Sequence, residues 1–415
     1  MANDSTVRTI EASEFAQWLG IVRTAMLGPP LDEAAIEGRR EAYELDRCLA
    51  AVAADGTLCG AAHAFHCDLT VPGGQVPAAA ITHVGVLPTH RRRGHLTRMM
   101  RSQLADVSQR GEPVAVLIAA EYPIYGRYGY GPATEACGFR VDVASLAASP
   151  GGGWREPPTG RVELVDNDSF AAVLPDLYER AQRRIPGHIT WRKREYEEVA
   201  GIRSSGGADR GAARKVLWRD GTGEIEGAAV YTVQGSWEHN RPSGELRANP
   251  VVAATDEAER ELMRFLCAVD WISTVRVDIR PVDDPLPLWL HDGRAAMLRD
   301  RSDHVWARLL DAPAALSARR YGTPGRLVMQ VHDPLGHAAG TFALEADTEG
   351  ASCRTTQARP DVVVPASALG AAYLGGVSWA RMLAGGWVVQ ERAGAVATAD
   401  AMFSTPRAPW CAHTF

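Results

Sequence analysis

The order of apolar and polar positions between residues 84 and 118 predicts a strand, a loop, a helix and a second strand. The short apolar run at 84–87 is typical of a strand that ends at Pro88. Apolar side chains then recur at helical spacing, with polar side chains on the opposite face. The apolar set is Leu96, Met99, Met100, Leu104 and Val107. Gly111 and Pro113 predict the end of the helix, and the apolar run 114–118 predicts the next buried strand.

The loop before this helix carries three arginines and a glycine, Arg91-Arg92-Arg93-Gly94. Free N–H groups at a helix N-terminus and nearby guanidinium groups together attract an anion, so the pattern predicts a pyrophosphate cradle. The alternative is a basic loop on an ordinary solvated helix. The chain has no Gly-x-Gly-x-x-Gly after a strand and no Gly-Lys-Ser/Thr, which excludes the usual dinucleotide and nucleoside triphosphate loops.

The same order of elements recurs faintly between residues 245 and 279. Strand-like runs at 245–248 and 251–252 precede a helical pattern at 257–266 and a strand pattern at 275–279. The connecting loop here is acidic, with Asp256 and Glu257 where the first copy has arginines. Because carboxylates repel a pyrophosphate, we expect the second copy to keep the fold without the cofactor site.

The length of 415 residues and the position of the Gly- and Pro-rich stretch indicate three domains. The Gly- and Pro-rich stretch from Ser149 to Gly160 predicts a flexible linker that ends a first domain at residues 1–150. A second domain is expected at 151–301. From about Ser302 the chain mixes alternating runs such as 327–331 with helical runs such as 368–374, which predicts a small α+β domain at 302–415.

Charge and cysteine usage narrow the class of protein further. A net charge of −6 disfavours nucleic acid or an anionic membrane as the main partner. Seven scattered cysteines without a Cys-x-x-Cys pair predict neither a disulfide framework nor a metal site, and they favour a cytoplasmic location. The first residues show no signal peptide, and no apolar run approaches the length of a membrane span.

Four tyrosines among glycines follow the strand at 114–118, at Tyr122, Tyr125, Tyr128 and Tyr130. Such a loop is either a packed aromatic plug or a site. A phenol, with a pKa of about 10, is able to protonate a departing thiolate of pKa about 8 to 9. The pattern alone does not say which tyrosine would do so.

Two sequence resemblances indicate the family of this chain. Arg91-x-x-Gly94-x-Leu96 resembles the acetyl-CoA motif of the GCN5-related N-acetyltransferases, with Leu96 in place of the usual final small residue. The chain also resembles the Eis (enhanced intracellular survival) N-acetyltransferases of actinobacteria, which acetylate aminoglycosides. That resemblance rests on residues 70–72, 84–94 and 124–134, and it continues weakly through 245–248 and 284–287 to Phe415.

The resemblance implies an α/β (α+β) architecture with two acetyltransferase-like domains, the second degenerate, and a C-terminal sterol-carrier-like domain. It implies acetyl-CoA as co-substrate, no metal, a small-molecule amine as acceptor and a homohexamer built as a dimer of trimers. It places the general acid at Tyr125 and the general base at the terminal carboxylate of Phe415. The implied cofactor contacts are Val84, Gly85, Val86, Arg92, Arg93, Gly94, His95, Leu96, Thr97, Ala120 and Glu121.

A terminal carboxylate has a pKa near 3.5 and is a weak base in water. A dry pocket makes it more basic and also attracts the ammonium form of the amine. A frayed tail is the alternative, but Trp410, Cys411, Ala412 and Phe415 make this tail more apolar than frayed tails usually are.

The departures from the family concern the acceptor. Aminoglycoside-acetylating members carry acidic residues where this chain has Ala25 and Thr414, and an aromatic residue where it has His83. Glu195, Glu197 and Glu198 near Trp191 are candidates to compensate for the lost charge. We therefore expect an N-acetyltransferase for an aminoglycoside-like or less cationic amine. The alternative is a non-catalytic protein that binds acyl-CoA or an apolar ligand.

Overall fold

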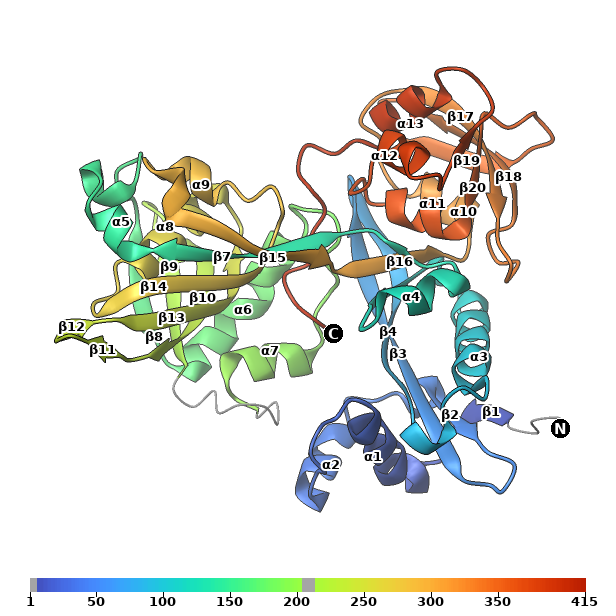
Figure 1. The fold of residues 1–415 in the computed structure, drawn as a ribbon, viewed down its shortest axis with the longest axis horizontal. Coiled ribbons are helices and arrows are strands. Elements are labelled where there is room, and N and C mark those ends of the chain that lie inside the picture. Colours follow the sequence, from blue (N-terminus) through green and yellow to red (C-terminus); the bar gives the residue numbers. More distant parts are fainter. Residues whose placement is uncertain (1–5, 204–212) are drawn as a thin grey trace. The chain divides into compact units, whose positions relative to one another are not determined.

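The computed structural model describes residues 6–203 and 213–415, which form two compact units (Figure 1). The first unit contains residues up to 133, residues 305–405 and Phe415. The second contains residues 134–304 and 406–414. The domain ranges expected from the sequence stay predictions. No helix in the described ranges is both long and apolar enough to cross a membrane.

A seven-stranded sheet in the order β1-β2-β3-β4-β5-β16-β6 forms the centre of the first unit. Its strands are β1 (Thr6–Thr9), β2 (Cys48–Val52), β3 (Leu58–Val71), β4 (Gly74–Val86), β5 (Val114–Ile118), β6 (Gly131–Pro132) and β16 (Val305–Leu309). The helices that belong to it are α1 (Phe15–Ala25), α2 (Glu33–Arg40), α3 (His95–Gln109) and α4 (Tyr122–Tyr125). The predicted helix and the strand after it are confirmed as α3 and β5, since the apolar residues of α3 are buried as its periodicity requires.

The second unit contains a seven-stranded sheet in the order β15-β7-β14-β13-β10-β9-β8. Its strands are β7 (Glu135–Asp142), β8 (Arg161–Val165), β9 (Arg214–Arg219), β10 (Ile225–Gln234), β13 (Gly244–Ala253), β14 (Ile272–Arg280) and β15 (Ala296–Asp303), with a short hairpin of β11 (Trp237–Glu238) and β12 (Arg241–Pro242). Its helices are α5 (Val143–Ala147), α6 (Asn167–Gln182), α7 (Lys193–Ala200), α8 (Asp256–Cys267) and α9 (Leu286–Trp289).

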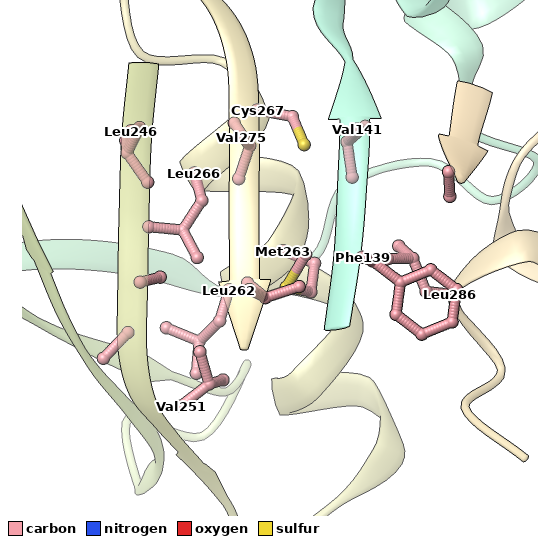
Figure 2. Close-up of a cluster of buried hydrophobic side chains, with 14 of the residues drawn as sticks. Phe139, Val141, Leu246, Val251, Leu262, Met263, Leu266, Cys267, Val275 and Leu286 are labelled. Carbon is pink, nitrogen blue, oxygen red and sulfur yellow. The ribbon is translucent and has the colours of Figure 1, made fainter. Parts of the chain in front are cut away.

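The core of the second unit confirms the predicted repeat. Figure 2 shows Leu262, Met263 and Leu266 of α8 packed against β13, β14 and β7. The strand, loop, helix and strand at β13, α8 and β14 follow the order of β4, α3 and β5, and in both copies the two strands pair in parallel.

The two large sheets are completed by strands that are distant in sequence. In the first sheet β16 pairs antiparallel with β5, and in the second sheet β7 pairs antiparallel with β14. β16 lies next to β5 of the parallel pair β4–β5, and β7 lies next to β14 of the parallel pair β13–β14, so the two strands occupy equivalent positions. The two units therefore repeat one architecture, but only the first takes a strand, β16, from beyond the sequence of the other, since β7 lies within residues 134–304 of the second unit.

The predicted flexible linker at 149–160 is wrong over its first part. Residues 150–153 form a short 3-10 turn, and Trp154 is only 6% exposed in the hydrophobic core of the second unit. Trp154 also bridges to Leu290, and the Arg264 guanidinium lies 4.9 Å from its ring centre. One large apolar side chain at the end of the glycine run is enough to bind this segment to the core.

The remaining part of the first unit is a five-stranded sheet in the order β19-β18-β17-β20-β21. Its strands are β17 (Gly325–His332), β18 (Gly340–Ala346), β19 (Ala351–Thr355), β20 (Val362–Pro365) and β21 (Val389–Gln390), with helices α10 (Ala312–Ser317), α11 (Ala366–Ala372), α12 (Trp379–Ala384) and α13 (Ala395–Phe403). This confirms the α+β pattern expected for the last third of the chain.

A close backbone contact and a buried ion pair join the two sheets of the first unit. Helix α11 passes directly over Gly131 of β6, where any Cβ would collide with the Ser367 carbonyl oxygen. The Arg308 guanidinium of β16 donates to the Asp333 carboxylate at 2.5 Å, and both side chains are fully buried.

Because removal of one partner leaves a buried charge, we expect Asp333→Ala to destabilise the protein by about 3 to 5 kcal/mol. Urea unfolding followed by tryptophan fluorescence measures this change. The control is Glu345→Gln, which breaks exposed ion pairs to Arg326 and Arg354 and is expected to cost less than about 1 kcal/mol. Equal losses for the two variants would contradict the assignment.

Candidate active site

The parallel strands β4 and β5 part in the middle of the first sheet. Their pairing runs from Ala78 opposite Val114 to Ile81 opposite Leu117 and then stops, although β4 continues to Val86. The sequence-predicted residues Val84, Gly85 and Val86 lie on this continuation and are half-buried. Their edge toward β5 has no strand partner. Unpaired backbone N–H and C=O groups on an open edge are able to bind an extended amide-containing chain such as the pantetheine arm of CoA.

A bulge in β4 produces this parting. Ala61 of β3 pairs with Gly85, but His63 pairs with Thr82, so β4 has one residue more than β3 in this interval. His83 takes up the extra length with a left-handed backbone, at φ 55°. Such a bulge bends and twists its strand. His83, which the sequence analysis identified as a departure from the family, is therefore the residue that allows β4 and β5 to part.

Gly85 lies under the end of α1. A Cβ added at Gly85 would be 2.5 Å from the Cβ of Ala25, so the strand and the helix end touch without a side chain between them. Ala25 thus contacts the cofactor strand directly. Met26 and Leu27, which follow it, are exposed by 51% and 91%. The helix end next to Gly85 therefore exposes apolar side chains.

The N-terminus of α3 carries the predicted anion cradle. Gly94 is its N-cap, with φ 79°, and no side chain caps the helix. The first-turn N–H groups, including those of His95, Leu96 and Thr97, therefore lack a side-chain acceptor. Arg91, Arg92, Arg93 and Gly94 are exposed beside them. Uncapped N–H groups, the helix dipole and a cationic loop fit a pyrophosphate.

His95 does not add charge to this cradle at neutral pH. Its ring is 3% exposed, and burial together with the nearby Arg98 charge lowers its pKa. Arg98 donates to the Arg93 carbonyl at 2.9 Å, which ties the loop to the helix. Among the predicted contacts, Thr97 also has a second role, since its hydroxyl is hydrogen-bonded to the Tyr128 hydroxyl at 3.0 Å.

The structure separates the four tyrosines of the loop. Tyr122 is 52% exposed, Tyr130 is fully buried and the Tyr128 hydroxyl is held by Thr97. Tyr125, at the end of α4, is 7% exposed and belongs to the hydrophobic cluster that also contains Ile81, with Val84 and Leu96 packed against it. Tyr128 and Tyr130 belong to the same cluster, so burial alone does not single out Tyr125, and its role as the acid stays a prediction from the resemblance.

Burial raises the pKa of Tyr125 to about 12, with smaller contributions from Tyr128 and Glu121. Its phenol is consequently protonated throughout the neutral range and is a proton or hydrogen-bond donor, not a base. Ala120 and Glu121, the last of the predicted contacts, are exposed in the turn between β5 and α4, where Ile124 N–H donates to the Glu121 carbonyl.

Phe415 lies with the first unit, where its ring centre is 6.2 Å from that of Phe65 on β3 in an edge-on arrangement. The predicted acid and the predicted base thus belong to the same unit as the anion cradle. The prediction that the tail is buried is supported, since Trp410, Cys411 and Ala412 are at most 6% exposed.

The carboxylates near Trp191 do not supply free negative charge. Glu195 pairs with Arg192, Glu198 pairs with Arg194 at 2.7 Å, and Glu197 pairs with Arg203 at 2.8 Å. Each carboxylate is matched by an arginine, which leaves little unpaired negative charge on this helix. No cluster of three or more His, Cys, Asp or Glu side chains able to hold a metal ion occurs within residues 6–203 and 213–415.

Sequence reasoning missed an aromatic and histidine cluster behind the bulge. Trp18, Tyr43, His63 and His83 have ring centres 4.8 to 6.4 Å apart. Trp18 lies on α1, Tyr43 follows α2, His63 lies on β3 and His83 lies on β4. Only the aromatic content of these segments signalled it, because nothing in local periodicity shows that they meet.

Comparison with known proteins places these features in context. Two acetyltransferase (GNAT) domain models match residues 6–133 and 187–309, and a sterol carrier protein domain model matches residues 312–412. A Streptomyces griseus protein described as an uncharacterized N-acetyltransferase is 40% identical over 99% of both chains. The N-acetyltransferase Eis of Mycobacterium tuberculosis is 34% identical over 74% of this chain and 73% of its own. The crystal structure of Eis1 from Mycobacterium abscessus matches with a TM-score of 0.86 and 34% identity, over 99% of this chain and 100% of that chain.

The anion cradle makes a specific prediction for CoA binding. Replacing Arg92 and Arg93 together by Gln is expected to weaken CoA binding roughly tenfold or more, at about 1 kcal/mol for each exposed charged contact. Isothermal titration calorimetry measures the change. Pantetheine, which lacks the pyrophosphate, should bind both proteins equally. Arg101→Gln, an exposed charge on the same helix, serves as control, and an equal loss there would contradict the cradle.

Proposed function

Because this chain belongs to the Eis family of GCN5-related N-acetyltransferases, we propose that it acetylates a small-molecule amine with Tyr125 as acid and the Phe415 carboxylate as base. One observation carries this proposal. The open edge of β4, the uncapped start of α3, Tyr125 and Phe415 all belong to the first unit. Acetyl-CoA supplies the activated acyl group as a thioester.

Each residue has a defined part in the transfer. The open backbone of Val84 and Val86 aligns the pantetheine arm, and the loop at Arg92 and Arg93 holds the pyrophosphate. The Phe415 carboxylate attracts the ammonium form of the acceptor and takes up a proton from it, directly or through water. The freed amine then attacks the thioester carbonyl, the C–S bond breaks as the C–N bond forms, and the second proton of the nitrogen passes to water.

Tyr125 stabilises the leaving thiolate. A thiol has a pKa of about 8.5, roughly 3.5 pKa units below that of the Tyr125 phenol, so full proton transfer from the phenol to the thiolate is uphill by about 5 kcal/mol. We therefore assign Tyr125 to hydrogen-bond donation to the sulfur as charge develops, and the thiolate leaves as an anion that takes its proton from water. A donor aimed at developing charge in a buried site is worth several kcal/mol.

The acceptor pocket favours an amine that is less cationic than an aminoglycoside. Ala25 places a methyl group against Gly85, and the loop after it exposes Met26 and Leu27. Polycations need several unpaired carboxylates for tight binding. The homohexamer stays a prediction from the resemblance, and the cytoplasmic location stays a prediction from cysteine usage.

Tyr125→Phe should lower kcat about 100-fold and leave the KM for acetyl-CoA nearly unchanged, because only the donor is lost. Release of CoA thiol with a panel of monoamines, diamines and aminoglycosides measures both constants. Since the pKa of Tyr125 is raised to about 12, the wild-type rate should not fall between pH 8 and pH 10 through its ionisation. Tyr122→Phe is the control. Full activity of Tyr125→Phe would refute the assignment.

One residue added after Phe415 should reduce kcat by at least tenfold, because it moves the terminal carboxylate about 3.5 Å along the chain. The same assay applies, with an N-terminal extension of equal length as control. Full activity of the extended chain would exclude the terminal carboxylate as base. Binding of CoA without turnover of any amine in the panel would support the alternative, a non-catalytic acyl-CoA binding protein.

A further inference from the structure

The second unit contains a cleft built like the first. Strand β13 has one residue more than β10 between Ala248 and Val251, which is a bulge like that in β4. The parallel pairing of β13 with β14 stops at Ala248 opposite Val277, although the strands continue to Ala253 and Arg280. An open edge therefore follows the bulge, in the place where the first sheet has the edge assigned to CoA.

The chain's own C-terminal segment lies at this cleft. Trp410 and Ala412 form a buried cluster with Ala136 and Ile185, and Ile279 of β14 packs against it. His413 and Thr414 line a cavity of about 200 Å³ together with Asn249 and Pro250 at the bulge and Ile279 across the gap. Residues from both sides of the parted strands thus contact or face the segment 410–414.

Backbone contacts hold Trp410 closely. Its N–H donates to the Pro186 carbonyl at 2.7 Å. A Cβ added at Gly187, which has φ 106°, would lie 3.0 Å from that same nitrogen, so only glycine permits the approach. The Arg280 guanidinium, itself buried and paired with Glu259 and Asp284, lies 5.5 Å from the Trp410 ring centre.

The charges at this cleft are the reverse of those in the first unit. Helix α8 begins with Asp256 and Glu257, and its first turn is already capped by the Thr255 hydroxyl. Asp256 pairs with Arg184 of the same unit. Arg407 of the tail donates to Asp283 at 2.9 Å and lies 3.9 Å from Asp256. The acids at this end of the second unit therefore pair with arginines, one of them from the tail, where the first unit has exposed arginines.

We propose that the second acetyltransferase-like domain is a binding site for the chain's own C-terminal peptide, residues 406–414, and that Trp191 and His304 position the Phe415 carboxylate. The first part stands on the contacts above. The second part rests on the proposed function, because it matters for catalysis only where that carboxylate is the base.

Two hydrogen bonds fix the tail at His413. The Trp191 indole N–H donates to Nδ1 of His413 at 2.8 Å, and Nε2 of His304 donates to its carbonyl oxygen at 3.1 Å. Burial lowers the pKa of both histidines, so both rings are neutral near pH 7 and an unprotonated Nδ1 of His413 accepts the Trp191 hydrogen bond. Only two residues follow His413, so the carboxylate lies within about 7 Å of chain from this point. Trp191 and His304 act through His413 and are positioning residues.

Digestion of the full-length protein by carboxypeptidase Y tests the first part without any reference to activity. Mass spectrometry follows the release of Phe415. Trp191→Phe keeps an aromatic ring at the stacked position 3.9 Å from Tyr178 and removes only the donor. We expect release to be at least tenfold faster in Trp191→Phe and in Arg407→Gln than in the wild type. Trp237→Phe, at an exposed tryptophan of the same unit, should release Phe415 at the wild-type rate.

A matched pair at His304 separates positioning from folding. His304→Gln retains a side-chain N–H donor near the place of Nε2, whereas His304→Leu does not. Carboxypeptidase Y should release Phe415 faster from His304→Leu than from the wild type, and from His304→Gln at close to the wild-type rate. Unchanged release in Trp191→Phe, Arg407→Gln and His304→Leu would overturn the proposal.

Steady-state kinetics of the same variants separate this proposal from the proposed function. If both hold, kcat falls in the variants that release Phe415 faster, while the KM for acetyl-CoA is unchanged. Faster release with an unchanged kcat would leave the peptide site in place and refute the carboxylate as base. The proposal also requires one CoA per chain in calorimetry, and binding of two would contradict it.

Discussion

The site depends on one constraint, which is that two parallel strands stop pairing before they end. β4 and β5 part after Ile81 and Leu117 because β4 contains an extra residue, and His83 accommodates it with a left-handed backbone. The parting exposes backbone groups of β4 that a fully paired sheet would satisfy internally. It also leaves room for α1 to reach Gly85 and for the start of α3 to face an anion. Without the bulge, neither the open edge nor the acceptor wall would exist.

The protein uses this construction twice with opposite charge. In the first copy the helix after the parted strand begins uncapped beside arginines, which suits a pyrophosphate. In the second copy the helix begins capped by Thr255 and beside Asp256, and Arg407 of the tail lies near that carboxylate. The loop before the helix thus differs in charge between the two copies, while the sheet, the bulge and the helix stay the same.

The sterol-carrier-like part of the first unit supports the tyrosine loop. Helix α11 packs on the backbone of Gly131, and the Arg308 guanidinium, paired with Asp333, approaches Gly129 so closely that a Cβ there would be 2.6 Å from it. These contacts fix the end of the loop that begins with Tyr125. A buried ion pair contributes little net stability over an apolar pair, but it strongly penalises any arrangement that separates its partners. The loop therefore has few alternative positions.

Local sequence determined the elements and their chemistry. The periodicity of α3 and α8, the arginines before one and the acids before the other can all be read without a structure, because a side chain's place on a helix and the charge of a loop are local properties. Tertiary structure decided the rest. The pairing of β16 with β5 and of β7 with β14, the burial of Trp154 in an apparent linker, the burial of Tyr125 and the position of the tail all depend on contacts between residues distant in sequence. Such contacts are set by shape and by which buried polar groups find partners, and no local pattern encodes them.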